Sequence, residues 1–163
     1  MNNKYSLITG GTAGIGLDIA KELAKRGHNI LLTARREERL KEISAFIKEE
    51  FNVDCNYITA DLADASAPEM IYNFCSENNY IVEILVNNAG YSINKKFHET
   101  GEDEEEKFLR VLGIAVVALT KKFIPSMLEQ KHGKIMMVSS LASFALPSTN
   151  SGTLYGPIKT FVN

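Results

Sequence analysis

The sequence has no tryptophan, only two cysteines and four prolines, and almost no net charge, and these shortages exclude several classes of protein. Cys55 and Cys75 lie in no disulfide or metal motif, so free thiols in a reducing compartment are expected. A formal net charge of -2 provides no basic field for nucleic acid or anionic lipid. The first residues lack a signal-peptide core, and the longest uncharged apolar stretch, 111–119, is half a membrane span. We therefore expect a cytoplasmic protein that binds neither nucleic acid nor membrane.

The three histidines, His28, His98 and His132, lie far apart in the sequence and form no metal-ligand pattern. No metal is expected, and each histidine is interpreted as a surface or loop residue.

Short apolar runs alternate with longer periodic segments along the 163 residues, of which 45% are hydrophobic. This alternation predicts an α/β fold, a Rossmann-like doubly wound parallel sheet with helices on both faces. Strands are expected at 4–9, 29–34, 54–60, 81–87 and 133–139. Helices are expected at 15–26, 37–51, 67–78 and roughly 103–131.

The fourth predicted helix is unusual because its middle, 108–119, is apolar on nearly every side. One face must meet the sheet, and another must meet a second partner. We therefore expect a homodimer or homotetramer that associates through this helix.

A glycine-rich turn follows the first predicted strand and opens the first helix. It runs Thr9-Gly10-Gly11-Thr12-Ala13-Gly14-Ile15-Gly16. Unpaired backbone N–H groups and the helix dipole at such a turn attract a pyrophosphate. Glycine can also be needed there only for positive φ, so the turn alone is weak evidence.

A second motif lies near the other end of the chain, where Tyr155 and Lys159 are one helical turn apart. The ordinary pKa of a tyrosine, about 10, is too high for efficient proton exchange at neutral pH. A neighbouring ammonium favours the phenolate and lowers that pKa. Together the two motifs indicate a nicotinamide-dependent oxidoreductase.

Further motifs follow in a fixed order, and with them the chain resembles the N-terminal part of a short-chain dehydrogenase/reductase of the NADP-preferring type. The motifs are Gly10, Gly14 and Gly16, then Asp61-Leu62, Asn87-Asn88-Ala89-Gly90, Ser139-Ser140, and Tyr155 with Lys159. The resemblance implies a single dinucleotide-binding domain over 1–163 that stops after the Tyr/Lys motif, without the later strands of the family.

The end of the second predicted strand favours NADP(H) over NAD(H). NAD enzymes normally place a carboxylate there for the ribose 2′-hydroxyl, but this sequence has Ala34 followed by Arg35 and Arg36. A guanidinium suits the 2′-phosphate of NADP(H). The alternative is an ordinary solvated helix start, which competes more strongly for Arg36 and Arg39 than for Arg35.

The resemblance also assigns the rest of the cofactor site. Asp61 would bind the adenine amino group with Leu62 beside the ring, although Asp61 could instead cap the following turn. Backbone atoms of Asn88, Ala89 and Gly90 would approach the cofactor ribose.

For catalysis, the resemblance implies hydride transfer between nicotinamide and a carbonyl or alcohol, with Tyr155 as the acid or base. Lys159 would assist Tyr155 and bind the nicotinamide ribose, while Ser140 would hold the substrate oxygen. The segment between Ser140 and Tyr155 is longer than is usual in the family, so Ser139 or Ser143 could take the serine role.

Two departures leave a second interpretation open. Leu112 stands where the family normally has an asparagine that supports a proton relay, and the sequence stops four residues after Lys159. The chain is therefore expected to be part of an NADP(H)-dependent enzyme or, alternatively, a catalytically impaired NADP-binding or interaction module. Tyr91, Phe144 and Leu146 hint at an apolar small-molecule substrate, but they could equally be core residues.

Overall fold

The computed structural model describes residues 3–144 and 154–163, and within them five parallel strands form one sheet. The strands are β1 (Lys4–Thr9), β2 (Asn29–Ala34), β3 (Cys55–Thr59), β4 (Ile81–Asn87) and β5 (Lys134–Met137). Their order in space is β3-β2-β1-β4-β5, with every pair parallel. The doubly wound fold predicted from the sequence is confirmed.

The strand bounds match the prediction for β1, β2 and β4, whereas β3 and β5 are shorter than predicted. Sheet hydrogen bonds nevertheless continue past both short strands, from Ala60 N to Ala34 O and from Val138 N to Asn87 O. The predicted and observed bounds of these two strands therefore differ by only one or two residues at each end.

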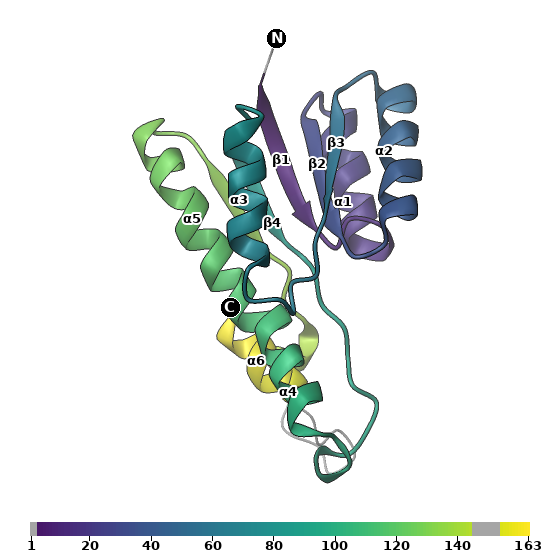
Figure 1. Cartoon of the computed structure of the whole chain (residues 1–163), viewed down its shortest axis with the longest axis vertical. Coiled ribbons are helices and arrows are strands. Elements are labelled where there is room, and N and C mark those ends of the chain that lie inside the picture. The colour runs from purple at the N-terminus through teal and green to yellow at the C-terminus, as the bar shows by residue number, and fades with distance from the viewer. Residues whose placement is uncertain (1–2, 145–153) are drawn as a thin grey trace.

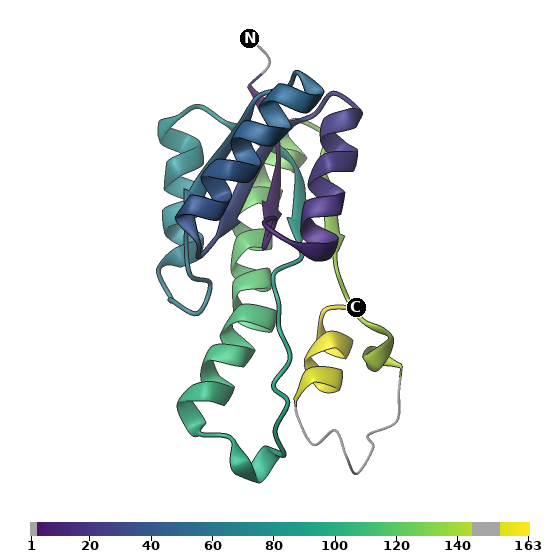
Figure 2. The same ribbon diagram turned by 90° about the vertical axis from the view of Figure 1, so that its right-hand side faces the viewer.

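Helices cover both faces of the sheet (Figures 1 and 2). On one face lie α1 (Gly14–Lys25) and α2 (Glu37–Phe51), and on the other lie α3 (Ala67–Glu77) and α5 (Ala115–Glu129). Consecutive strand residues such as Leu31 and Leu32 point to opposite faces, and both are fully buried. Each face therefore has its own hydrophobic core.

The remaining elements extend past the carboxyl ends of the strands (Figures 1 and 2). They are α4 (Glu102–Leu109), the π-helical segment η2 (Arg110–Ile114), α6 (Tyr155–Phe161) and two short 3-10 turns, η1 (Phe97–Glu99) and η3 (Leu141–Ser143). These elements and the strand ends together surround the site described below.

The fourth predicted helix is correct in position but is not a uniform α-helix, because η2 separates α4 from α5. At Gly113 an added Cβ would lie 2.7 Å from Ile158 Cδ1, so α6 packs closely against this irregular turn. π-Helical turns of this kind are frequent at functional sites.

The run Glu102–Glu129 is long and apolar enough to cross a membrane by length and composition. It is also packed against α3 and β4, as core helices of soluble proteins are. The length and composition of this run are therefore weak evidence for a membrane span.

Candidate functional site

The turn between β1 and α1 has the backbone of an anion-binding loop. Gly10 and Gly14 have φ of 68° and 51°, values that L-residues rarely adopt. A Cβ at Gly14 would meet nothing within 4 Å, so this side of the turn is open to a ligand. The first turn of α1 contains no acidic residue, and its N-cap, Ala13, makes no side-chain hydrogen bond. The amide dipoles there are free to attract a phosphate.

Asn88 fixes this turn to the end of β4. Its Nδ2 donates to Thr9 O at 2.8 Å and to Gly10 O at 3.3 Å, while its backbone N–H donates to Thr9 Oγ1 at 3.0 Å. A Cβ at Gly16 would lie 2.3 Å from the same Nδ2, so glycine is required there for close packing. Asn88 therefore acts as a support for the turn through its side chain.

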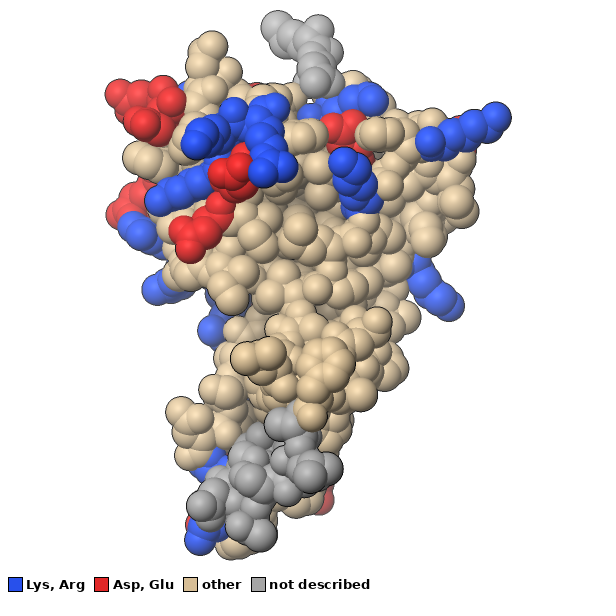
Figure 3. Space-filling view, turned by 180° about the vertical axis from the view of Figure 1, so that it is seen from behind, with Lys and Arg blue, Asp and Glu red and all other residues tan. Residues whose placement is uncertain are grey.

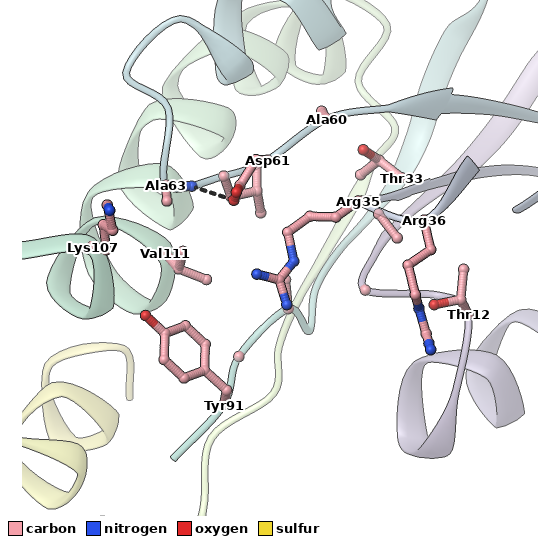
Figure 4. Close-up of a pocket in the computed structure, with 15 residues that line it drawn as sticks. Thr12, Thr33, Arg35, Arg36, Ala60, Asp61, Ala63, Tyr91, Lys107 and Val111 are labelled. Carbon is pink, nitrogen blue, oxygen red and sulfur yellow. Dashed lines mark hydrogen bonds between the residues drawn. The ribbon is translucent and has the colours of Figure 1, made fainter. Parts of the chain in front are cut away.

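A cavity of about 380 Å³ opens beside this turn, at the carboxyl ends of the strands (Figure 4). In open α/β sheets, ligands bind in this crevice where the strand order reverses, here between β1 and β4. The predicted site residues that line it are Gly10, Thr12, Arg35, Arg36, Asp61, Leu62, Ala89 and Gly90. Gly14, Ile15, Gly16 and Asn88 lie in or against the adjoining turn but do not line the cavity.

The sequence analysis did not predict several other lining residues, namely Thr33, Ala60, Ala63, Lys107 and Val111, and it named Tyr91 only as a hint of an apolar substrate. Val111 follows Lys107 by one helical turn, so both lie on one side of the helical run. Tyr91 directly follows the Asn87–Gly90 motif, and this adjacency was the available signal for it. Figure 4 shows the Arg35 guanidinium directed into the cavity, between Asp61 and Tyr91.

Arg35 and Arg36 differ from the other arginines in their charge partners. Arg26, Arg39 and Arg110 each pair with a glutamate three or four positions away in the sequence, at 2.8–2.9 Å. Within the described ranges, 3–144 and 154–163, no ion pair forms at Arg35 or Arg36. Two guanidinium groups that form no ion pair with the described residues therefore line a cavity that also contains the Asp61 carboxylate, and this balance of charge suits an anionic ligand.

Asp61 stabilises a turn and also lines the cavity, so its two predicted roles are compatible with each other. Its Oδ1 accepts a hydrogen bond from Ala63 N at 3.0 Å, which stabilises the turn after β3. The same carboxylate lines the cavity and can still accept from a ligand amino group.

Tyr155 and Lys159 come together on α6. Lys159 is buried, and its Nζ lies 5.9 Å from the centroid of the Tyr155 ring and donates to Val138 O at 2.7 Å. Burial lowers the pKa of Lys159. An ammonium that is poorly hydrated acts strongly on charge that develops beside it.

The three candidate serines differ in how their hydroxyls are used. Ser139 Oγ donates to Lys159 O at 2.9 Å, and Ser143 Oγ donates to Ser140 O at 2.6 Å. Ser140 Oγ instead accepts from Ala142 N at 3.2 Å. This pattern favours Ser140 as the serine whose proton can be offered to a ligand.

Leu112 is buried in η2 beside the lysine. A Cβ at Gly90 would contact both Leu112 Cγ, at 3.6 Å, and Lys159 Nζ, at 3.7 Å. The apolar side chain of Leu112 therefore lies near Lys159, at the position where the family normally has an asparagine.

No group of three or more potential metal ligands is placed to hold an ion among the residues that the structure describes. Both cysteines are free, as the sequence predicted, and both are buried.

The comparisons with known proteins agree with this geometry. The sequence pattern described as "short chain dehydrogenase" matches residues 4–163. The very-long-chain 3-oxoacyl-CoA reductase of Rattus norvegicus is 35% identical over 164 residues, which cover 98% of this chain and 51% of that protein. The fatty acyl-CoA reductase of Acinetobacter baylyi is 33% identical over 147 residues, which cover 89% and 50%.

Among solved structures, a short-chain dehydrogenase from Sphingobium yanoikuyae in complex with NADPH superposes with a TM-score of 0.90 at 29% identity. The match covers 98% of this chain and 61% of that one. The chain spans about half the length of the two reductases named above.

Proposed function

This chain belongs to the short-chain dehydrogenase family, and we propose that its protein is an NADP(H)-dependent oxidoreductase acting on a carbonyl or alcohol group. The observation that carries the proposal is the cavity with two unpaired arginines beside a glycine turn open to a phosphate. The residues present fit the cofactor: the turn suits its pyrophosphate, Arg35 and Arg36 its 2′-phosphate, and Asp61 its adenine amino group.

When bound, the nicotinamide cofactor supplies or accepts the hydride. Tyr155 would then give a proton to the substrate oxygen or take one from it, and Ser140 would hold that oxygen by a hydrogen bond. Lys159 would stabilise the phenolate form of Tyr155 through its nearby positive charge. These roles remain predictions for the three side chains.

The substrate is proposed to be an apolar small molecule. Leu141 and Phe144 are highly exposed next to Ser140, and Phe161 is exposed on α6. Seen from behind, the middle of the molecule is a broad area without lysine, arginine, aspartate or glutamate (Figure 3). Of the other two residues of the sequence argument, Tyr91 lines the cavity and Leu146 lies outside the described residues.

Cofactor preference tests the cofactor proposal directly. NADPH should bind at least about tenfold more tightly than NADH, because a charged hydrogen bond contributes about 1.5–3 kcal/mol. Arg35→Asp should narrow or invert that preference in a fluorescence titration. Arg39→Asp is the matched control, because Arg39 pairs with Glu42 instead of lining the cavity. Equal affinity of the unaltered protein for the two cofactors would refute the proposal.

Turnover tests the catalytic roles. NADPH oxidation against a panel of ketones and aldehydes should be lost in Tyr155→Phe, which keeps the ring but removes the proton. NADPH affinity should change little, because Tyr155 lies outside the adenosine end of the cavity. Unchanged turnover in Tyr155→Phe would remove Tyr155 from its proposed role.

A catalytically impaired NADP-binding module is the second candidate, and Leu112 beside Lys159 is the observation that favours it. In that case NADPH would bind with the same Arg35 dependence, but no substrate in the panel would cause its oxidation.

A further inference from the structure

Three aromatic rings form a continuous chain from the cofactor cavity to the proposed catalytic tyrosine. The Tyr91 ring meets the Phe108 ring edge-on, with centroids 5.5 Å apart and an interplanar angle of 89°. Phe108 in turn contacts Tyr155, with centroids 6.4 Å apart and an angle of 50°. Phe108 is fully buried on α4, so it has no room to move independently of its neighbours.

The first ring of this chain lies close to a positive charge in the cavity. Tyr91 lines the cavity, and Figure 4 shows it next to the Arg35 guanidinium. Burial raises the pKa of Tyr91, and the positive charge of Arg35 acts in the opposite direction. A phosphate bound at Arg35 would neutralise that charge and so change the surroundings of Tyr91.

The last ring of the chain, that of Tyr155, lies near both Phe108 and Lys159. Phe108 lies against the Tyr155 ring, and the Lys159 ammonium lies 5.9 Å from the centroid of the same ring. A displacement of Phe108 would therefore change how the Tyr155 phenol sits relative to the ammonium. Position matters here, since about 1 Å of misplacement can cost on the order of a hundredfold in rate.

We propose that Phe108 is a positioning residue for Tyr155, and that it couples occupancy of the phosphate end of the cavity to the orientation of the Tyr155 ring. This inference rests on the proposed function, because it requires the cavity to bind the adenosine phosphate part of NADP(H). Packed side chains with little free space can carry such coupling between neighbouring sites.

The test uses adenosine 2′,5′-bisphosphate, which carries the 2′-phosphate but has no nicotinamide to contact Tyr155. The protein is labelled with 3-fluorotyrosine, and the resonances of Tyr91 and Tyr155 are assigned with single Tyr→Phe variants. In the unaltered protein the ligand should shift both fluorine resonances. In Phe108→Leu it should shift the Tyr91 resonance alone, at an unchanged dissociation constant.

Two further variants guard against a trivial loss of folding. Phe123→Leu is the matched control, because Phe123 is also buried and also contacts a tyrosine ring. Its partner is Tyr72, with ring centroids 5.6 Å apart, and this pair lies away from the site. It should keep the Tyr155 response. Tyr91→Leu alters a partly exposed ring at the cavity end and leaves the core intact. At saturating ligand it should abolish the Tyr155 response.

The outcomes separate this inference from the proposed function. If calorimetry detects no binding of the bisphosphate to the unaltered protein, the cofactor site is wrong and the coupling is wrong with it. If the ligand binds but the Tyr155 resonance stays still in the unaltered protein, or moves equally in Phe108→Leu and Tyr91→Leu, only the coupling is overturned.

Discussion

At the scale of single residues, the two cysteines give the clearest dependence on pH. Burial raises the pKa of the Cys55 and Cys75 thiols to about 12. An unfolded cysteine has a pKa of about 8.5, so above that pH the unfolded chain loses protons that the folded protein keeps. The free energy of unfolding should therefore fall as the pH rises, by about 1.4 kcal/mol for each thiol at one pH unit above 8.5.

Urea unfolding at pH 7.5 and 9.5 measures this dependence. The variant with both Cys55→Ala and Cys75→Ala should be less stable at pH 7.5, because each truncation leaves a cavity. Between the two pH values it should lose less stability than the unaltered protein. An equal loss in both proteins would show that the thiols do not control this pH range.

The two arginines that follow β2 show where residue-level sequence reasoning reaches its limit. Arg35 could be predicted as a phosphate ligand because it follows the missing acid directly. Arg36 and Arg39 could not be distinguished from the sequence, since each is next to one glutamate of the Glu37-Glu38 pair. The structure separates them, because the helical spacing brings Arg39 to Glu42 at 2.9 Å while Arg36 lines the cavity.

At the scale of elements, the β1–α1 turn depends on the lack of a side chain at Gly16. In Gly16→Ala the new Cβ would lie 2.3 Å from Asn88 Nδ2 and 2.5 Å from Gly10 O. The expected destabilisation is roughly 1–3 kcal/mol, as for other over-packed sites. NADPH binding should also weaken, because the turn would shift.

Gly90→Ala is the matched comparison for stability. A Cβ there makes ordinary contacts of 3.6 Å and longer, so chemical denaturation should find a much smaller change than in Gly16→Ala. If the two variants lose the same free energy of unfolding, the close contacts of the turn are not the reason for glycine at position 16.

The elements that the sequence predicted well are those with strong local patterns. Buried strands read as apolar runs and amphipathic helices as periodic ones, so their positions follow from nearby residues. The π-helical segment η2 could not be predicted in this way, because Gly113 there packs against Ile158, which is 45 positions further along the chain. Lys107 was missed for the same reason, since only the fold brings it to the cavity.

At the scale of the whole molecule, the outer face of α5 supports association between copies. Ile114, Val117, Ile124 and Leu128 form an exposed apolar stripe along η2 and α5, at helical spacing. A stripe of this length is commonly covered by a partner subunit. We therefore propose that copies of the chain associate through this face as a homodimer or homotetramer.

Light scattering tests the assembly. Val117→Glu should dissociate it, because Val117 is 41% exposed and a carboxylate would have to be buried in the interface. The neighbouring Val116 is a less suitable position for this substitution, because its side chain is partly buried within the protein itself. Ala45→Glu is the matched control, because it adds the same negative charge at an exposed position of α2, outside the stripe. A soluble monomer for the unaltered protein would end the proposal.

The close pairing of β1 with β4 has a consequence for how the molecule folds. Thr9 and Asn88 are bonded to each other although 79 positions separate them, and the cavity lies just beyond this contact. Contacts so distant along the chain form late, because closing a long loop costs entropy before any contact repays it. The binding site therefore cannot exist in partly folded chains that contain only the local units. A dinucleotide would stabilise the finished fold by mass action and give no help to its intermediates.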